Sequence, residues 1–115
     1  MKTLCRLAIL LLCLAAAAGC RRKDIRTARI HVPQMAGDAC RERVVAAVSR
    51  QQGVLGDKVT VDAETRDVVV PYESLVLSLK NIEYAISAAG FDADDIPADP
   101  EARAALPPEC RDSAD

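Results

Sequence analysis

The chain has 115 residues, of which 50% are hydrophobic, and it carries 15 basic and 17 acidic residues. This length accommodates one domain at most. Tryptophan is absent, aromatic residues make up 3% of the chain, and the basic residues are scattered, so the sequence does not indicate a nucleic-acid partner. No Ser-His-Asp set, glycine-rich phosphate loop or paired-carboxylate pattern indicates an enzyme.

Residues 1–19 have the pattern of a cleaved export signal. Lys2 and Arg6 form a short basic region, Leu7 to Leu14 an apolar run, and Ala15 to Gly19 a stretch of small residues. The apolar run is shorter than the roughly 20 residues that span a bilayer as a helix. Cleavage after residue 19 would leave 13 basic and 17 acidic residues, a net charge of −4.

The segment Ala17-Ala18-Gly19-Cys20 resembles a bacterial lipobox, with Ala17 where lipoboxes usually carry Leu. The resemblance implies that Cys20 receives lipid and becomes the new N-terminus, followed by a linker over residues 20–25. The basic residues of this linker favour anionic headgroups. We therefore expect the chain to lie on the periplasmic side of a bacterial cell envelope, anchored by lipid on Cys20. Ordinary secretion to the periplasm is the alternative.

The first half of the domain is predicted to contain a strand and a helix. Residues 27–32 alternate between small or polar and apolar residues, as half-buried strands do, and Pro33 ends the run. Asp38 can cap a helix from Ala39 to about Gln52, and Gly53 can end it. One stripe of this helix consists of Val44, Val48 and Gln51, with Ala47 beside it.

Two strands and a second helix are predicted next. Residues 58–62 and 68–72 favour a hairpin with its turn at residues 63–66. Ser74 can cap a helix that ends at Gly90 and whose apolar residues recur every three or four positions: Leu75, Leu79, Ile82, Ile86 and Ala89. A last strand over residues 91–96 should be short, frayed or absent, because aspartates are poor strand formers.

Residues 97–115 are predicted to form a proline-rich tail. Asp99, Pro100 and Glu101 provide a cap, a first-turn proline and a favourable charge for a short helix over residues 102–106. Pro107 and Pro108 should end it and make the approach to Cys110 extended.

The strand-helix-strand-strand-helix order, with a methionine in the loop before the first helix, resembles the heavy-metal-associated domain of copper chaperones, mercury-binding periplasmic proteins and metal-pumping ATPases. The likeness rests on residues 31–35 leading into Cys40, and on residues 53–54, 59–62 and 88–91. It implies an α+β fold over residues 26–96. This is a ferredoxin-like βαββα(β) sandwich, with two helices on one face of an antiparallel sheet.

The family motif is Met-x-Cys-x-x-Cys, and its overlay places Met35 on the methionine, Gly37 on the first cysteine and Cys40 on the second. One metal-binding cysteine is therefore replaced. The resemblance implies that Met35 packs beneath the loop and that Asp38 and Phe91 lie beside the site. A cysteine in the first helical turn is favoured as thiolate, the form that binds soft ions.

Cleavage and lipidation would leave two thiols, those of Cys40 and Cys110. The tail between residues 97 and 110 can span roughly 40 Å, so Cys110 can reach Cys40. The pair can be a disulfide, a shared metal site or two unrelated thiols. His31 is expected to be a surface residue or one whose hydrogen bonds are satisfied, rather than a metal ligand. The acidic stretch at residues 92–99 should be solvated, because it lacks the pattern of a calcium loop.

The leading hypothesis is an envelope-anchored carrier or sensor-like domain for a soft metal ion such as Cu(I), Hg(II) or Zn(II). Cys40 would bind the ion with Cys110 or a partner's thiol, and a second protein would donate or accept it. The alternative is a structural or protein-interaction module of the same fold with structural thiols. A redox sensor with Cys110 as resolving cysteine is a third interpretation.

Overall fold

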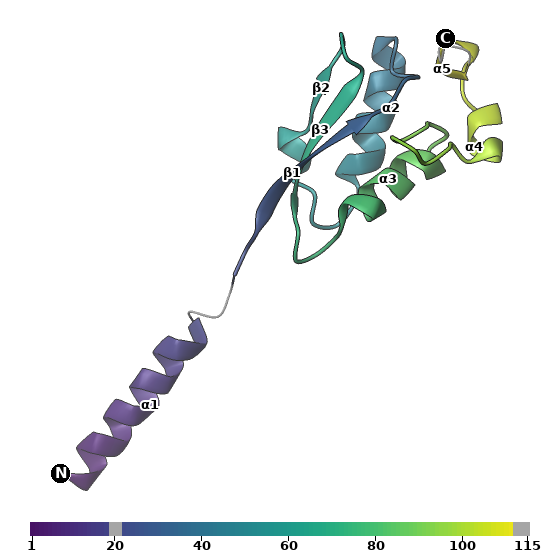
Figure 1. Cartoon of the computed structure of the whole chain (residues 1–115). Helices are drawn as coiled ribbons and strands as arrows, with labels where there is room; N and C mark the ends of the chain where they lie inside the picture. Colours follow the sequence, from purple (N-terminus) through teal and green to yellow (C-terminus); the bar gives the residue numbers. More distant parts are fainter. Residues whose placement is uncertain (19–21, 112–115) are drawn as a thin grey trace.

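The computed structural model describes residues 1–18 and 22–111 (Figure 1). Helix α1 (Lys2–Ala18) stands apart from the rest, and its large apolar side chains up to Leu14 are exposed. In the described ranges, no helix is both long and apolar enough to span a bilayer. The predicted lipidation site Cys20 lies outside these ranges. The signal peptide, its cleavage and the boundaries of the segments therefore stay predictions.

A three-stranded antiparallel sheet forms the base of the domain in the described residues. It consists of β1 (Ile25–His31), β2 (Thr60–Asp62) and β3 (Asp67–Glu73), in the order β1-β3-β2. Ala28 lies opposite Val70 and Ile30 opposite Val68 across the central pair of strands. These four side chains are buried and alternate with more exposed ones, because successive residues of a strand point to opposite faces.

Two helices cover the buried face of the sheet (Figure 1). Helix α2 (Asp38–Ser49) buries Cys40, Val44 and Val48, which lie four residues apart on one stripe. Helix α3 (Leu79–Ala88) contributes Ile82 and Ile86 to the same core. The predicted α+β fold, with two helices on one face of an antiparallel sheet, is confirmed.

No fourth strand forms among the described residues, as the aspartates of residues 92–95 indicated. Ala93 and Ile96 form only an isolated bridge. Asp94 takes the place of a neighbouring strand: its backbone N–H donates to the His31 carbonyl, and its carboxylate accepts from the His31 backbone N–H, each at 2.9 Å. The backbone groups of His31, at the end of β1, are thus both paired with Asp94, which has a positive φ of 51°.

Several element boundaries differ from those predicted. Helix α2 begins at Asp38, with Gly37 as its N-cap, so the capping role predicted for Asp38 is wrong. It ends at Ser49 rather than Gln52, and Gly53 follows in a turn with φ +97°. A short 3₁₀ turn, η1 (Gly56–Lys58), delays β2 to Thr60.

The start of the second helix is also corrected. Its N-cap is Ser78, which forms a capping box with Asn81, and not Ser74. Ser74 instead donates its hydroxyl to the Asp24 carboxylate, and its backbone N–H donates to the Asp24 carbonyl. Leu75 therefore precedes the helix and is exposed, although the sequence pattern placed it on the buried stripe.

The tail folds back over the domain through two short helices, α4 (Pro100–Ala104) and α5 (Pro108–Arg111). Asp99 caps α4 as predicted, accepting from the Ala102 N–H at 3.0 Å. The extended approach predicted for Cys110 is wrong, because Pro108 begins α5. Proline is favoured at a first helical position, since its missing N–H has no partner there.

Candidate functional site

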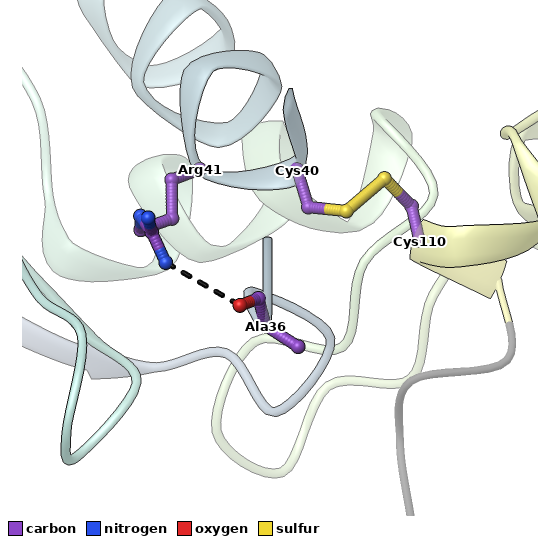
Figure 2. Close-up of a disulfide and its surroundings, with 4 residues drawn as sticks. All are labelled: Ala36, Cys40, Arg41 and Cys110. Atoms are coloured by element: carbon purple, nitrogen blue, oxygen red, sulfur yellow. Dashed lines mark hydrogen bonds between the residues drawn. A yellow bond between two sulfur atoms is a disulfide. The ribbon is translucent and has the colours of Figure 1, made fainter. Parts of the chain in front are cut away.

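Cys40 and Cys110 are joined by a disulfide (Figure 2). Their sulfur atoms are 2.11 Å apart and their Cα atoms 5.5 Å apart, across a sequence separation of 70 residues. Both side chains are fully buried. Of the three arrangements left open by the sequence, the structure has the disulfide. A role for either sulfur in metal binding stays a prediction.

Cys40 lies in the first turn of α2, where backbone N–H groups have no partner inside the helix. The turn is held by Arg41. Its backbone N–H donates to the Gly37 carbonyl at 3.0 Å, and its guanidinium donates to the Ala36 carbonyl at 3.4 Å (Figure 2) and to the Asp38 carboxylate. Asp38 therefore fixes the guanidinium rather than capping the helix. The sulfur of Cys40 lies at the positive end of the helix.

Gly37 occupies the position at which the family motif has its first cysteine. Its backbone is extended, with φ −114° and ψ 163°, which any residue can adopt. A Cβ atom added there would have no neighbouring heavy atom within 4 Å. Gly37 also lines an open depression of about 440 Å³, together with Cys40 and Glu109. The site of the replaced cysteine is thus empty, open and next to the disulfide.

The floor of the loop is built from buried side chains. Met35 and Phe91 are fully buried in the core, and for Met35 this burial was predicted. Gln34, which sequence reasoning missed, is fully buried too and contacts Asp92 twice. Its amide donates to the Asp92 carboxylate at 2.6 Å, and its carbonyl oxygen accepts from the Asp92 N–H at 3.0 Å. The pair fastens the loop before α2 to the segment that begins the tail.

The tail is then guided toward Cys40 by hydrogen bonds. Asp92 accepts from the Ala98 N–H at 2.7 Å. Ser87 on α3 donates its hydroxyl to the Pro97 carbonyl at 2.8 Å, and its own carbonyl accepts from the Asp99 N–H at 2.9 Å. Asp92 and Asp99 therefore organise the tail. Asp92 is partly buried, whereas Asp94, Asp95 and Asp99 are exposed, as predicted for a solvated acidic stretch.

Close packing holds α4 in place beyond these bonds. A Cβ at Gly90 would lie 2.9 Å from the Ala102 backbone, so only glycine permits this approach, and its φ of +99° also favours glycine. Arg103 donates to the Arg111 carbonyl at 3.2 Å, which links α4 to α5. Contacts other than the disulfide thus position the residues that flank Cys110.

His31 belongs to a separate cluster on the outer face of the sheet. Its Nδ1 lies 3.0 Å from the Asp67 carboxylate, which also accepts from Arg29 Nε at 2.8 Å. Partial burial raises the pKa of Asp67, but the hydrogen bonds from His31 and Arg29 outweigh it and keep the pKa below 3.8. His31 is satisfied, as predicted. Within residues 1–18 and 22–111, no three His, Cys, Asp or Glu side chains gather as a metal site.

Comparison with known proteins is consistent with this architecture. The model of the heavy-metal-associated domain matches residues 29–92. No curated protein matches the chain. Among solved structures, oxidized MerP from Ralstonia metallidurans CH34 is 32% identical, with a TM-score of 0.57, and the match covers 62% of this chain and 96% of MerP.

Two other structures share the fold. A copper binding domain from HMA7, a P-type ATPase, is 28% identical with a TM-score of 0.56, over 60% of this chain and 90% of that one. The CopZ metallochaperone is 24% identical with a TM-score of 0.55, over 59% and 98%. Because the family model matches more than half of the residues, the chain belongs to the heavy-metal-associated domain family.

Proposed function

We propose that this chain is an envelope-anchored carrier or sensor of soft metal ions, whose reduced form binds one ion through the thiolates of Cys40 and Cys110. The observation that carries the proposal is the second sulfur beside Cys40, which comes from the tail rather than from the loop. MerP, CopZ and the copper binding domain of HMA7 are relatives or share the fold, which supports metal binding rather than catalysis.

The ligand set favours ions that accept few, soft ligands. Two thiolates suit Cu(I) or Hg(II), because thiolate selects soft metals. Zn(II) is almost always four-coordinate in structural sites, and the described residues offer no third or fourth ligand in a cluster. We therefore propose Cu(I) or Hg(II) as cargo and disfavour Zn(II), unless a partner protein supplies the remaining ligands.

Preorganisation of the tail supports a shared site in the reduced protein. The bonds from Ser87 and Asp92, and the close approach of α4 to Gly90, are made by residues other than the two cysteines. After reduction the Cys110 thiol would therefore stay close to Cys40, as a tethered ligand with a high effective concentration. A free tail thiol would lose this advantage.

Metal loading would require reduction, because both sulfurs are buried and bonded to each other. A dithiol reductant would supply two electrons and two protons, becoming a disulfide itself, and would leave two thiols. Each thiol loses its proton when the ion binds. A partner's thiolate could then exchange with one of the two ligands through the depression lined by Gly37 and Glu109.

The test is a Cu(I) titration of reduced residues 22–115 against a competing chelator. Wild type should bind one equivalent, and Cys40→Ser and Cys110→Ser should each lose at least about 1.4 kcal/mol of binding free energy, a tenfold weaker affinity. His31→Ala is the matched control, because the imidazole of His31 is hydrogen-bonded to the Asp67 carboxylate. Equal affinities for wild type and Cys40→Ser would refute metal binding through Cys40, whereas a loss only in Cys40→Ser would refute the role of Cys110.

Anchoring is tested separately. Mass spectrometry of the N-terminal peptide from a bacterial membrane fraction should show an acylated Cys20, and Cys20→Ser should move the protein to the soluble periplasmic fraction. An N-terminus without lipid would leave ordinary secretion as the route.

A second function is favoured by the complete burial of the disulfide. In that case the bond is structural and the domain acts as a protein-interaction module that has lost metal transport. Thiol counting under mild dithiol reductant separates the two. Under the structural alternative, the bond stays intact in the folded protein at glutathione-like potentials. Under the metal proposal, two thiols appear without unfolding.

A further inference from the structure

Four large aliphatic side chains are exposed together at the end of the domain where the chain enters it. They are Ile25, Leu75, Val76 and Leu79, with exposed fractions from 38% to 67%. Leu75 and Leu79 belong to the stripe that the sequence assigned to the core. Leu75 precedes α3 and Leu79 is its first residue, and both are exposed. We call these four residues the apolar end. Clustered exposed aliphatic residues mark an interaction surface more often than isolated ones do.

The apolar end is fastened to the entry segment of the chain. Ile25 pairs with Glu73 at the start of the sheet, and the next residue, Ser74, is bonded to Asp24 by both its backbone and its hydroxyl. Leu75 and Val76 follow at once. Asp24 is the fourth residue after Cys20, and four residues span at most about 14 Å. A membrane anchor on Cys20 would therefore keep the apolar end within reach of the bilayer.

The charges of the entry segment suit a lipid surface. Residues 22–26 contain three basic side chains and one acidic one. Lys23 and Arg26 pair with Glu73 and Asp24 but stay 78% and 68% exposed. Lys80, beside Leu79, pairs with Glu83 and is 63% exposed. Basic residues around exposed aliphatic ones are the combination that binds the interface of an anionic bilayer.

We infer that the apolar end docks onto the membrane surface, with Leu75 and Val76 in the boundary between headgroups and acyl chains. The inference rests on the envelope anchoring proposed above and adds an orientation to it. Strand β1 runs from the apolar end toward the loop before α2, and its seven residues extend about 23 Å. Docking at one end therefore presents the Cys40–Cys110 end to the aqueous phase, where a partner protein can reach it.

The absence of tryptophan allows a direct test. The full chain, expressed with its own leader and purified from membranes, is reconstituted into vesicles of phosphatidylethanolamine and phosphatidylglycerol, with or without brominated acyl chains. Leu75→Trp reports on the apolar end. Ala104→Trp is the matched control, because Ala104 is also exposed but lies on α4, in the tail. Urea midpoints of both variants verify the fold.

We expect brominated lipid to quench the fluorescence of the Leu75→Trp variant by roughly twofold or more and to leave that of the Ala104→Trp variant unchanged. Adding Val76→Asp to the Leu75→Trp variant should abolish the quenching. Equal quenching in both variants, or none in a chain that floats with the vesicles, overturns the docking.

Two further readouts distinguish the other outcomes. A concentration-dependent blue shift of the Leu75→Trp emission without vesicles would assign the surface to a second copy of the chain and overturn the docking. A chain that fails to float overturns the anchoring on which the docking rests. The metal titration tests the proposed cargo independently of both.

Discussion

Reduction of the Cys40–Cys110 disulfide should cost the domain a large part of its stability. The bond closes a loop with a sequence separation of 70 residues. In the chain-entropy model, a loop of that size removes about 14.8 cal/mol/K from the unfolded ensemble, or about 4.4 kcal/mol at 25 °C. Small domains are stable by about 5–15 kcal/mol. The reduced form is therefore expected to keep only a fraction of the stability of the oxidised form.

The assay is urea unfolding of residues 22–115 in the oxidised form, in the reduced form and as the Cys40→Ser/Cys110→Ser double variant. With a slope of about 1 kcal/mol/M, the reduced midpoint should fall by about 2–4 M, allowing for measured values below the entropic limit. The double variant should match the reduced wild type, because it lacks the same bond. A midpoint that falls by less than about 0.5 M, with an unchanged slope, would refute the reasoning.

The same free energy connects the bond to metal binding. If the fold is stabilised by about 4.4 kcal/mol through the bond, linkage makes the bond harder to reduce by about 90 mV than in the unfolded chain. A ligand at about 1,000 times its Kd stabilises a folded protein by about 4.1 kcal/mol. Cu(I) at that excess should return the reduced midpoint close to the oxidised one. Failure of Cu(I) to raise the reduced midpoint would contradict the proposed cargo.

Four further outcomes are expected. Gly37→Cys should tighten Cu(I) binding by the reduced protein by about 1.4 kcal/mol or more, because the backbone at this position is extended and an added Cβ has free space. An unchanged Cu(I) affinity in the chelator competition would contradict this. Gly90→Ala should destabilise the fold by about 1–3 kcal/mol in urea and slow reoxidation of the disulfide, since its Cβ meets the backbone of α4. Ile82→Ala should cost about 2–5 kcal/mol, and an unchanged urea midpoint would place its side chain outside the core. His31→Ala should raise the carboxyl pKa of Asp67 toward 3.8 in an NMR titration. The lowered pKa of the native protein stabilises the fold above about pH 4, and this stabilisation is lost as the pH falls through the native pKa. In the variant the stabilisation should be smaller.

The sheet and the helix cores were predictable from the sequence because burial follows simple periods. Ala28 and Ile30 alternate with exposed residues on β1, and Val44 and Val48 recur at helical spacing. These periods are set by backbone geometry, so they can be read without knowing the neighbours. The same holds for the weak last strand, where consecutive aspartates oppose a regular ladder.

The first residues of the helices could not be predicted from the hydrophobic period, because the sequence offers two candidate N-cap residues for each helix. Serine is a good N-cap residue at both position 74 and position 78. Which of the two caps the helix depends on Asp24, whose carboxylate accepts the hydrogen bond of the Ser74 hydroxyl. Ser78 has Asn81 in the position that completes a capping box, which is a local signal that the hydrophobic period alone does not carry. At α2, Gly37 takes the cap position, and Asp38 is engaged by Arg41 instead.

For the tail, only the distance that it can span was predictable from the sequence, and its path was not. Chain length allowed Cys110 to approach Cys40, but its direction is set by side chains that bind backbone groups far away in sequence. Ser87 holds Pro97, and Asp92 connects Gln34 to Ala98. A buried Gln and a partly buried Asp have no periodic signature, so their pairing appears only in three dimensions. Pro108 did carry a signal, because proline begins helices as readily as it ends them.

In this chain the sulfur beside Cys40 comes from Cys110 in the tail, and not from the loop position occupied by Gly37. Gly37 leaves empty the place where the motif has its first sulfur, and Cys110 brings a sulfur to Cys40 from the tail instead of the loop. A loop motif keeps both ligands together whatever the tail does, whereas the second ligand proposed for this chain, Cys110, would depend on the docking of α4 and α5. Any change that loosens the tail, such as Gly90→Ala, should therefore weaken metal binding without touching a ligand. In a protein with both sulfurs in the loop, the same change would leave affinity unaltered, and this difference separates the two designs experimentally.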